Sequence, residues 1–133
     1  MENVETPKKK YDLEERLLKF ARQCRDFIGA LKKDIANYEY GRQLIRSSAS
    51  IGANYIEANE SFSKKDLLLR LKISKKEAKA TIYWLNLVDT KSDAMLEKDR
   101  QRLTGEAKEL VLILSTIIKK NIFRIWCLEF EIL

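Results

Sequence analysis

The sequence predicts an all-α protein, an up-down-up-down antiparallel four-helix bundle. Four segments place apolar residues at alternating steps of three and four, which gathers them on one side of a helix. The 133 residues include only one proline and four glycines, so little interrupts long helices. Apolar residues make up 45% of the chain, enough for one core, and the short connections favour antiparallel neighbours.

The first helix is expected to begin at Asp12, with Glu15 three residues later as in a capping box, and to end near Leu31. Cys24 falls within its apolar seam, where a buried, reduced thiol is expected. The seam consists of Leu13, Leu17, Phe20, Cys24, Phe27 and Leu31.

The second helix is expected to begin near Asn37, a residue type that caps helix N-termini well, and to extend to about Asn59. One side carries the bundle seam, and another carries a polar row: Arg46, Ser47, Ser50, Asn54 and Glu57. Two interpretations stay open. The row is an ordinary outward face, or it is a hydrogen-bonded seam between helices or subunits, with Arg46 and Glu57 as charged partners.

The third helix is expected to begin at Ser63, which forms a second capping box with Asp66. Its core seam consists of Leu68, Leu71, Ala78, Ile82 and Leu85. A second apolar face consists of Leu69, Ile73, Ala80, Trp84 and Leu87. Because one bundle covers only one face of each helix, this second face predicts an interface between copies of the chain.

Between these two faces, the third helix carries a basic stripe: Lys65, Lys72, Lys76, Lys79 and, at its end, Tyr83. From Lys64 to Lys91 there are eight basic and three acidic residues, so this segment holds nearly all of the net charge of +6. Lysines at this spacing can follow a phosphate backbone, and a tyrosine can stack on a base. The alternative is a solvated face whose lysine stems cover apolar surface at a subunit boundary.

The fourth helix is expected to begin with Ser92 or Asp93 as its cap, and the bundle as a whole is expected to span residues 11–121. Residues 1–10 read as a flexible basic arm. Residues 122–133 are unusually apolar for a terminus, which predicts an extension of the fourth helix or a contact with another subunit.

The composition argues against an enzyme. Without any histidine, the chain cannot carry a histidine general base, a Ser-His-Asp system or an HExxH metal site. The sequence has no glycine-rich phosphate loop and no carboxylate cluster suited to Mg²⁺, so we expect no catalytic residue, metal or cofactor. It also shows no signal peptide and no apolar run of about 18 residues, which predicts a cytoplasmic protein.

Two blocks, RSSASIGANYIEA from Arg46 and SKKDLLLRLKISKKEAKATIYWLNL from Ser63, resemble the four-helix-bundle proteins encoded in intervening sequences of bacterial 23S ribosomal RNA genes. The resemblance implies a cyclic homo-oligomer, typically a pentamer, without established catalytic activity. It also implies a relationship to the accessory proteins of diversity-generating retroelements, which associate with a reverse transcriptase and nucleic acid. Residues 122–133 match nothing in that pattern.

Together these observations predict a non-enzymatic oligomer that binds RNA or DNA through the lysines of the third helix. One alternative is a protein-interaction scaffold, in which the second apolar face docks a partner polypeptide such as a reverse transcriptase. Another is a metal-dependent nuclease, for which the sequence offers no ligand cluster.

Overall fold

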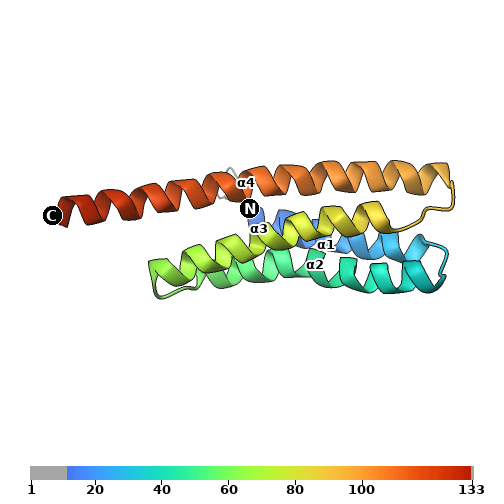
Figure 1. Cartoon of the computed structure of the whole chain (residues 1–133), viewed down its shortest axis with the longest axis horizontal. Coiled ribbons are helices and arrows are strands. Elements are labelled where there is room, and N and C mark those ends of the chain that lie inside the picture. Colours follow the sequence, from blue (N-terminus) through green and yellow to red (C-terminus); the bar gives the residue numbers. More distant parts are fainter. Residues whose placement is uncertain (1–11, 133) are drawn as a thin grey trace, which may run out of the picture.

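A computed structural model of the protein describes residues 12–132, with side chains to residue 128, and its described part contains four α-helices and no strand. The helices are α1 (Leu13–Ala30), α2 (Ile35–Asn59), α3 (Lys64–Leu87) and α4 (Ala94–Ile132). They lie side by side, with the α1–α2 and α3–α4 connections at one end of the molecule and the α2–α3 connection toward the other (Figure 1). The predicted all-α class is confirmed. The predicted basic arm, residues 1–10, lies outside the described residues.

Three of the helices begin at caps that the sequence predicts. The Asp12 carboxylate accepts a hydrogen bond from the Glu15 backbone N–H at 3.1 Å. The Ser63 hydroxyl accepts one from the Asp66 backbone N–H, also at 3.1 Å. For α4 the cap is Asp93, the second of the two candidates, whose carboxylate accepts from the next helical N–H groups at 3.0 Å. Each side chain satisfies N–H groups that have no partner inside their own helix.

The prediction that Asn37 caps α2 is wrong. The helix begins two residues earlier, and its cap is Asp34, whose carboxylate accepts from the Asn37 backbone N–H at 2.8 Å. Asn37 itself is only 3% exposed. Its side-chain amide donates to the carbonyls of Lys32 (2.8 Å) and Asp89 (2.9 Å) and accepts from the Asp89 N–H (2.8 Å). Asn37 therefore binds the α1–α2 connection to the α3–α4 connection, because its amide can donate and accept at once.

A lysine strengthens the same end of the bundle. The Lys91 ammonium lies 2.6 Å from the Asp34 carboxylate and 3.3 Å from that of Asp89. Hydrogen bonds from the Asn37 and Lys91 backbones, together with the Lys91 side chain, lower the pKa of both carboxyl groups. Lys91 and Ser92 both have positive φ, 55° and 62°, a conformation that non-glycine residues adopt at a cost. These contacts offset that cost.

The core runs along the predicted three-and-four seams. On α1 the buried residues include Leu17, Phe20 and Cys24, and on α4 they include Leu103, Leu110 and Leu114. Burial raises the pKa of the Cys24 thiol to about 12, so this cysteine is an inert core residue, as expected from its position. None of the described helices is long and apolar enough to cross a membrane.

The last helix is much longer than the others, at 39 residues, and continues to Ile132 past the end of the bundle (Figure 1). Ile118 is the last buried residue among its described side chains, where it packs with Ala58 of α2 and Leu71 of α3. The apolar stretch that begins at Ile122 is therefore helical as far as Ile132.

We predict that Asn37→Ala lowers the free energy of unfolding by roughly 1–3 kcal/mol. The substitution removes the side-chain hydrogen-bond partner of three backbone groups, the Lys32 carbonyl and the carbonyl and N–H of Asp89. Urea denaturation followed by circular dichroism measures the change. Asn86→Ala is the matched control, since the exposed Asn86 amide bonds only to a carbonyl one turn earlier in its own helix. Equal effects of the two substitutions would show that Asn37 is not a structural connection.

Candidate nucleic-acid interface

The basic stripe of α3 lies on the side of the helix that faces away from the core. Its four lysines are all exposed, and Tyr83 is 60% exposed. The buried residues of the helix lie on the opposite side: Leu71, Ser74, Ala78, Thr81 and Leu85. At 3.6 residues per turn, the stripe is turned roughly half a revolution from these residues, so its ammonium groups extend into solvent.

Two acidic residues beside the stripe, Glu57 and Glu77, pair with arginines. Arg70 contacts the Glu57 carboxylate at 2.8 Å, and Arg46 approaches Glu77 at 3.7 Å. Among the ion pairs of residues 12–128, none involves Lys65, Lys72, Lys76 or Lys79. The arginines thus neutralise the nearby carboxylates, and the lysine charges stay available for an anion.

The polar row of α2 faces α3 of the same chain. Ser47 is fully buried, with its hydroxyl 2.9 Å from that of Thr81. The Ser74 hydroxyl donates directly to the Ile51 carbonyl of α2 at 2.7 Å. This contact between a side chain of one helix and the backbone of another requires the two helices to pack closely.

The outer half of the polar row is bonded more locally. The hydroxyl of Ser50 donates to the Arg46 carbonyl at 2.7 Å, and the Asn54 amide donates to the Ser50 carbonyl at 2.9 Å. Asn54 also accepts from Arg70 of α3 at 3.4 Å. Arg46 and Glu57 each find a charged partner on α3. The row therefore lies between two helices of one chain.

Sequence reasoning missed the α3 half of this seam. Ser74 and Thr81 stand seven residues apart, so they share one side of α3. A pair of small polar residues at that spacing, opposite the small polar row of α2, is a signal that could have located the contact.

The second apolar face of α3 is only partly exposed. Leu69 is 53% exposed, whereas Ile73, Ala80, Trp84 and Leu87 are half-buried. Tyr40 of α2 stacks on Trp84 with ring centroids 6.1 Å apart, and Tyr83 meets the same indole edge-on at 5.2 Å. The chain itself thus covers part of the surface that the sequence assigns to an oligomer interface.

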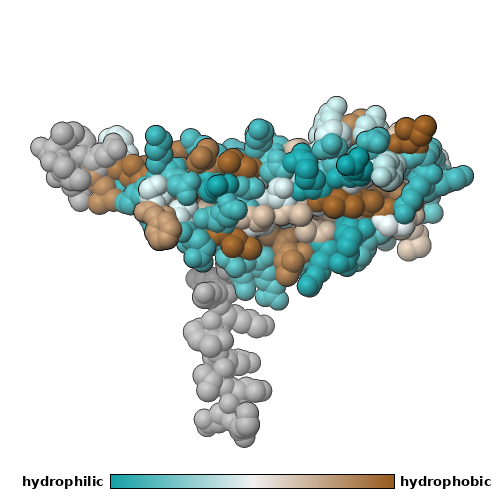
Figure 2. Space-filling model, turned by 90° about the horizontal axis from the view of Figure 1, so that it is seen from below, coloured by the Kyte–Doolittle hydropathy of each residue, from teal (hydrophilic) through white to brown (hydrophobic). Residues whose placement is uncertain are grey.

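Other large apolar side chains are exposed on α1 and α2. Ile45 and Ile56 broaden the apolar side of α2 but remain exposed, as do Tyr38 on the same helix and Leu18 on α1. Figure 2 shows hydrophobic residues spread between hydrophilic ones along one face of the molecule. The exposed apolar surface is therefore distributed over several helices.

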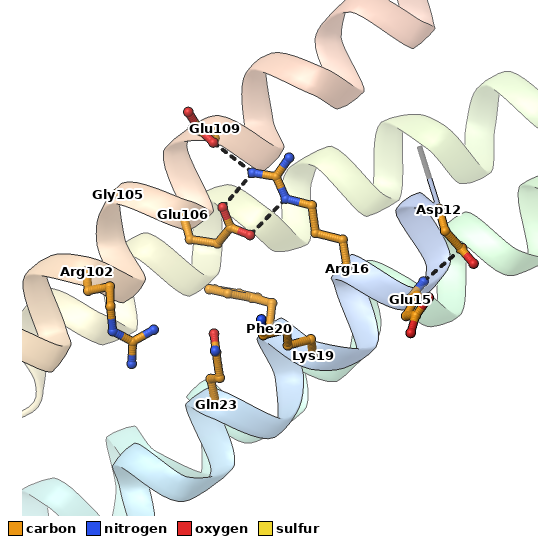
Figure 3. Close-up of a pocket in the computed structure, with 10 residues that line it drawn as sticks. All are labelled: Asp12, Glu15, Arg16, Lys19, Phe20, Gln23, Arg102, Gly105, Glu106 and Glu109. Atoms are coloured by element: carbon orange, nitrogen blue, oxygen red, sulfur yellow. Dashed lines mark hydrogen bonds and ion pairs between the residues drawn. The ribbon is translucent and has the colours of Figure 1, made fainter. Parts of the chain in front are cut away.

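A groove of about 850 Å³ lies between α1 and α4 (Figure 3). The Arg16 guanidinium crosses it to Glu106, with contacts of 2.6 and 2.9 Å, and to Glu109 at 2.7 Å. The bond from Arg16 lowers the pKa of the Glu106 carboxyl group. The Glu106 carboxyl group is therefore held ionised by the guanidinium, which does not suit it to donate a proton. Within residues 12–128, no group of three or more His, Cys, Asp or Glu residues could hold a metal ion.

Comparison with known proteins places this fold in a family. The family model of the 23S rRNA-intervening sequence protein matches residues 9–116. A crystal structure of a protein with unknown function from the S23 ribosomal protein family of Bacteroides thetaiotaomicron is similar, with a TM-score of 0.68 and 28% identity. That match covers 80% of this chain and 97% of the other. No curated protein matches the chain. With four helices and a family match over most of its length, the chain belongs to the 23S rRNA-intervening sequence protein family.

Proposed function

We propose that this protein is a non-enzymatic, cytoplasmic homo-oligomer that binds RNA or DNA through the basic stripe of α3. Each copy is an up-down-up-down antiparallel bundle, a topology supported by the contacts of Asn37 between the first and third connections. The lysines neutralise phosphates, and Tyr83 stacks on a base. Little sequence is read, because phosphate contacts carry no base information.

The observation that carries this proposal is that arginines of α2 and α3, and not the stripe lysines, pair with Glu57 and Glu77. Glu57 and Glu77 have arginine partners, whereas the four stripe lysines belong to no ion pair of the described residues. A face whose lysines served only to balance local charge would pair them with these carboxylates. Exposed, unpaired lysines in a row instead leave a positive field along the helix.

The dimensions of the stripe suit a nucleic-acid strand. From Lys65 to Lys79 the helix rises about 21 Å, at about 1.5 Å per residue. Because a duplex strand places a phosphate about every 3.4 Å along the axis, the stripe can face about six phosphates. Four lysines over that length are enough for a contact that depends strongly on salt.

Assembly into a ring of five copies, the number that the family resemblance implies, would repeat the stripe around an axis. The exposed apolar side chains support such assembly: Leu69 on α3, Ile45 and Ile56 on α2, and Leu18 on α1. A monomer would leave these residues in water, and several of them lie on helices that neighbour one another. Repetition by symmetry turns a short stripe into an extended positive surface.

A protein-interaction scaffold is the second candidate. Leu69, together with the partly exposed Trp84, could receive an apolar segment of a partner polypeptide, for example a reverse transcriptase-like protein. In that case the lysines would serve solubility, and nucleic-acid affinity would be absent even at low salt.

Replacing Lys72, Lys76 and Lys79 by glutamate should abolish most binding to labelled RNA. Filter binding across a salt series measures how the binding constant changes with salt. When the logarithm of the binding constant is plotted against the logarithm of the salt concentration, we expect the unaltered protein to give a slope of about −3 to −4 for each engaged stripe. The slope should weaken by about one for each lysine removed, because each releases one counterion less.

The matched control is a variant in which glutamate replaces Lys32, Lys33 and Lys98. It makes the same change in charge at exposed residues away from the stripe. Equal losses from the two triple variants would mean that net charge, not the stripe, causes binding. No binding by the unaltered protein at low salt would favour the scaffold. RNA cleavage that a chelator abolishes would instead indicate a nuclease.

Light scattering tests the assembly. Five copies of 15.6 kDa would give a mass of about 78 kDa, and any mass above that of a monomer supports an oligomer. Leu69→Lys should lower the mass, because it places a charge in the proposed contact. Met95→Lys, an equally drastic change at an exposed residue of α4, should leave the mass unchanged. A monomeric unaltered protein would overturn this part of the proposal.

A further inference from the structure

A phenylalanine stands fully in solvent in the α2–α3 connection. Phe62 lies between Asn59, the last residue of α2, and Lys64, the first residue of α3, and its exposed fraction is 107%. Connections usually hold glycine, proline, asparagine, aspartate or serine, and serines do flank Phe62 on both sides. A single exposed apolar residue is ordinary on a protein surface, so the position of Phe62 decides what it can do.

Phe62 does not help to fold the connection. It directly precedes Ser63, the cap of α3, and an apolar residue at this position often packs against the fourth residue of the helix. That residue is Leu67, which packs on the core cluster that contains Ala58 and Leu71. Among the described residues, Phe62 belongs to no core cluster and to no ring contact. Its ring is therefore available to a molecule outside the chain.

The basic stripe begins three residues after Phe62. Lys64 and Lys65 are both exposed, and neither belongs to an ion pair of the described residues. At the other end of the stripe, Tyr83 is 60% exposed, and its ring lies against the Trp84 indole at a centroid distance of 5.2 Å. From Lys64 to Tyr83 the helix rises about 29 Å, at about 1.5 Å per residue. An aromatic ring thus stands at each end of the row of lysines.

We propose that Phe62 is a base-stacking residue and that the α3 surface binds a single strand rather than a duplex. The proposal rests on the nucleic-acid binding proposed for the basic stripe, and it names the class of ligand. Inside a duplex, neighbouring pairs cover the flat faces of the bases, whereas an unpaired strand can turn its bases onto aromatic side chains. The lysines hold the phosphates, and Phe62 and Tyr83 each stack on a base.

The separation of the two rings also favours a single strand. With stacked bases about 3.4 Å apart, a strand that follows the stripe for about 29 Å places about nine nucleotides along it. On a duplex, only the two terminal base pairs offer an open face, so both rings could stack only on a duplex of that one length. A single strand is flexible and offers a face at every base.

The same surface does not suit a membrane. A helix that lies in a membrane interface has a continuous apolar side, with its basic residues on the opposite side. The side of α3 that faces away from the core carries the four stripe lysines, and Phe62 adds one apolar ring at its end. Phosphates with unpaired bases match this combination of charged and aromatic groups.

Fluorescence anisotropy with a labelled single strand of about 15 nucleotides, and with the duplex of the same sequence, tests the proposal. We expect the unaltered protein to bind the single strand more tightly than the duplex. Phe62→Ala should weaken single-strand binding by about 5- to 150-fold, the equivalent of about 1–3 kcal/mol, and leave duplex binding unchanged. The dependence on salt should stay the same, because phenylalanine carries no charge.

Ile35→Ala is the matched control and should change neither affinity. Ile35 is 87% exposed and begins α2, at the end of the bundle opposite the α2–α3 connection (Figure 1). Two further variants separate stacking from a merely apolar contact. Phe62→Trp should preserve single-strand binding, and Phe62→Leu should lose as much affinity as Phe62→Ala, because leucine is apolar but has no ring.

Full single-strand affinity of Phe62→Ala or Phe62→Leu would overturn the proposal, as would equal losses for the single strand and the duplex. If Phe62→Ala keeps its affinity while replacement of Lys72, Lys76 and Lys79 abolishes it, the stripe binds nucleic acid and the stacking is wrong. If the unaltered protein binds neither ligand, both proposals are wrong. Binding to anionic vesicles that Phe62→Ala abolishes would overturn the stacking in favour of a membrane contact.

Discussion

Close packing of α2 on α3 fixes the direction in which the rest of the molecule presents its side chains. The Ser74 hydroxyl reaches the Ile51 carbonyl at 2.7 Å, and Ser47 lies 2.9 Å from Thr81, so only small side chains fit between these helices. These bonds satisfy buried polar groups that would otherwise cost roughly 1–3 kcal/mol each. They also fix the rotation of α3 about its axis. With its small polar side held against α2, the basic stripe has no position except toward solvent.

The same requirement for satisfied polar groups shapes the end of the bundle where two connections meet. Connections expose backbone groups that no helix satisfies, and the amide of Asn37 serves both of them. Lys91 adds a charge between Asp34 and Asp89, in a connection whose backbone is strained at Lys91 and Ser92. The ends of all four helices are therefore held in register by side chains from only a few positions.

These two regions show what the sequence could and could not predict. Periodicity located the core seams, because burial in a bundle depends on spacing alone, and Asp12 and Ser63 marked helix starts through purely local bonds. Asn37 was misread as a cap, since its true partners are 5 and 52 residues away along the chain. The coverage of Trp84 by Tyr40 was missed for the same reason: contacts between helices depend on their relative rotation, which spacing within one helix does not determine.

The pairing of charges on α3 follows from the chemistry of the two cations. An arginine fork can approach a carboxylate while its stem packs against a neighbouring helix, so Arg70 and Arg46 suit the boundary between α2 and α3. A lysine is a compact, strongly hydrated charge, and exchanging its water for a phosphate oxygen requires no fixed orientation. A surface built to read bases would need the planar groups of arginine or amides. The arginines therefore bind within the chain, and the lysines of the basic stripe face outward.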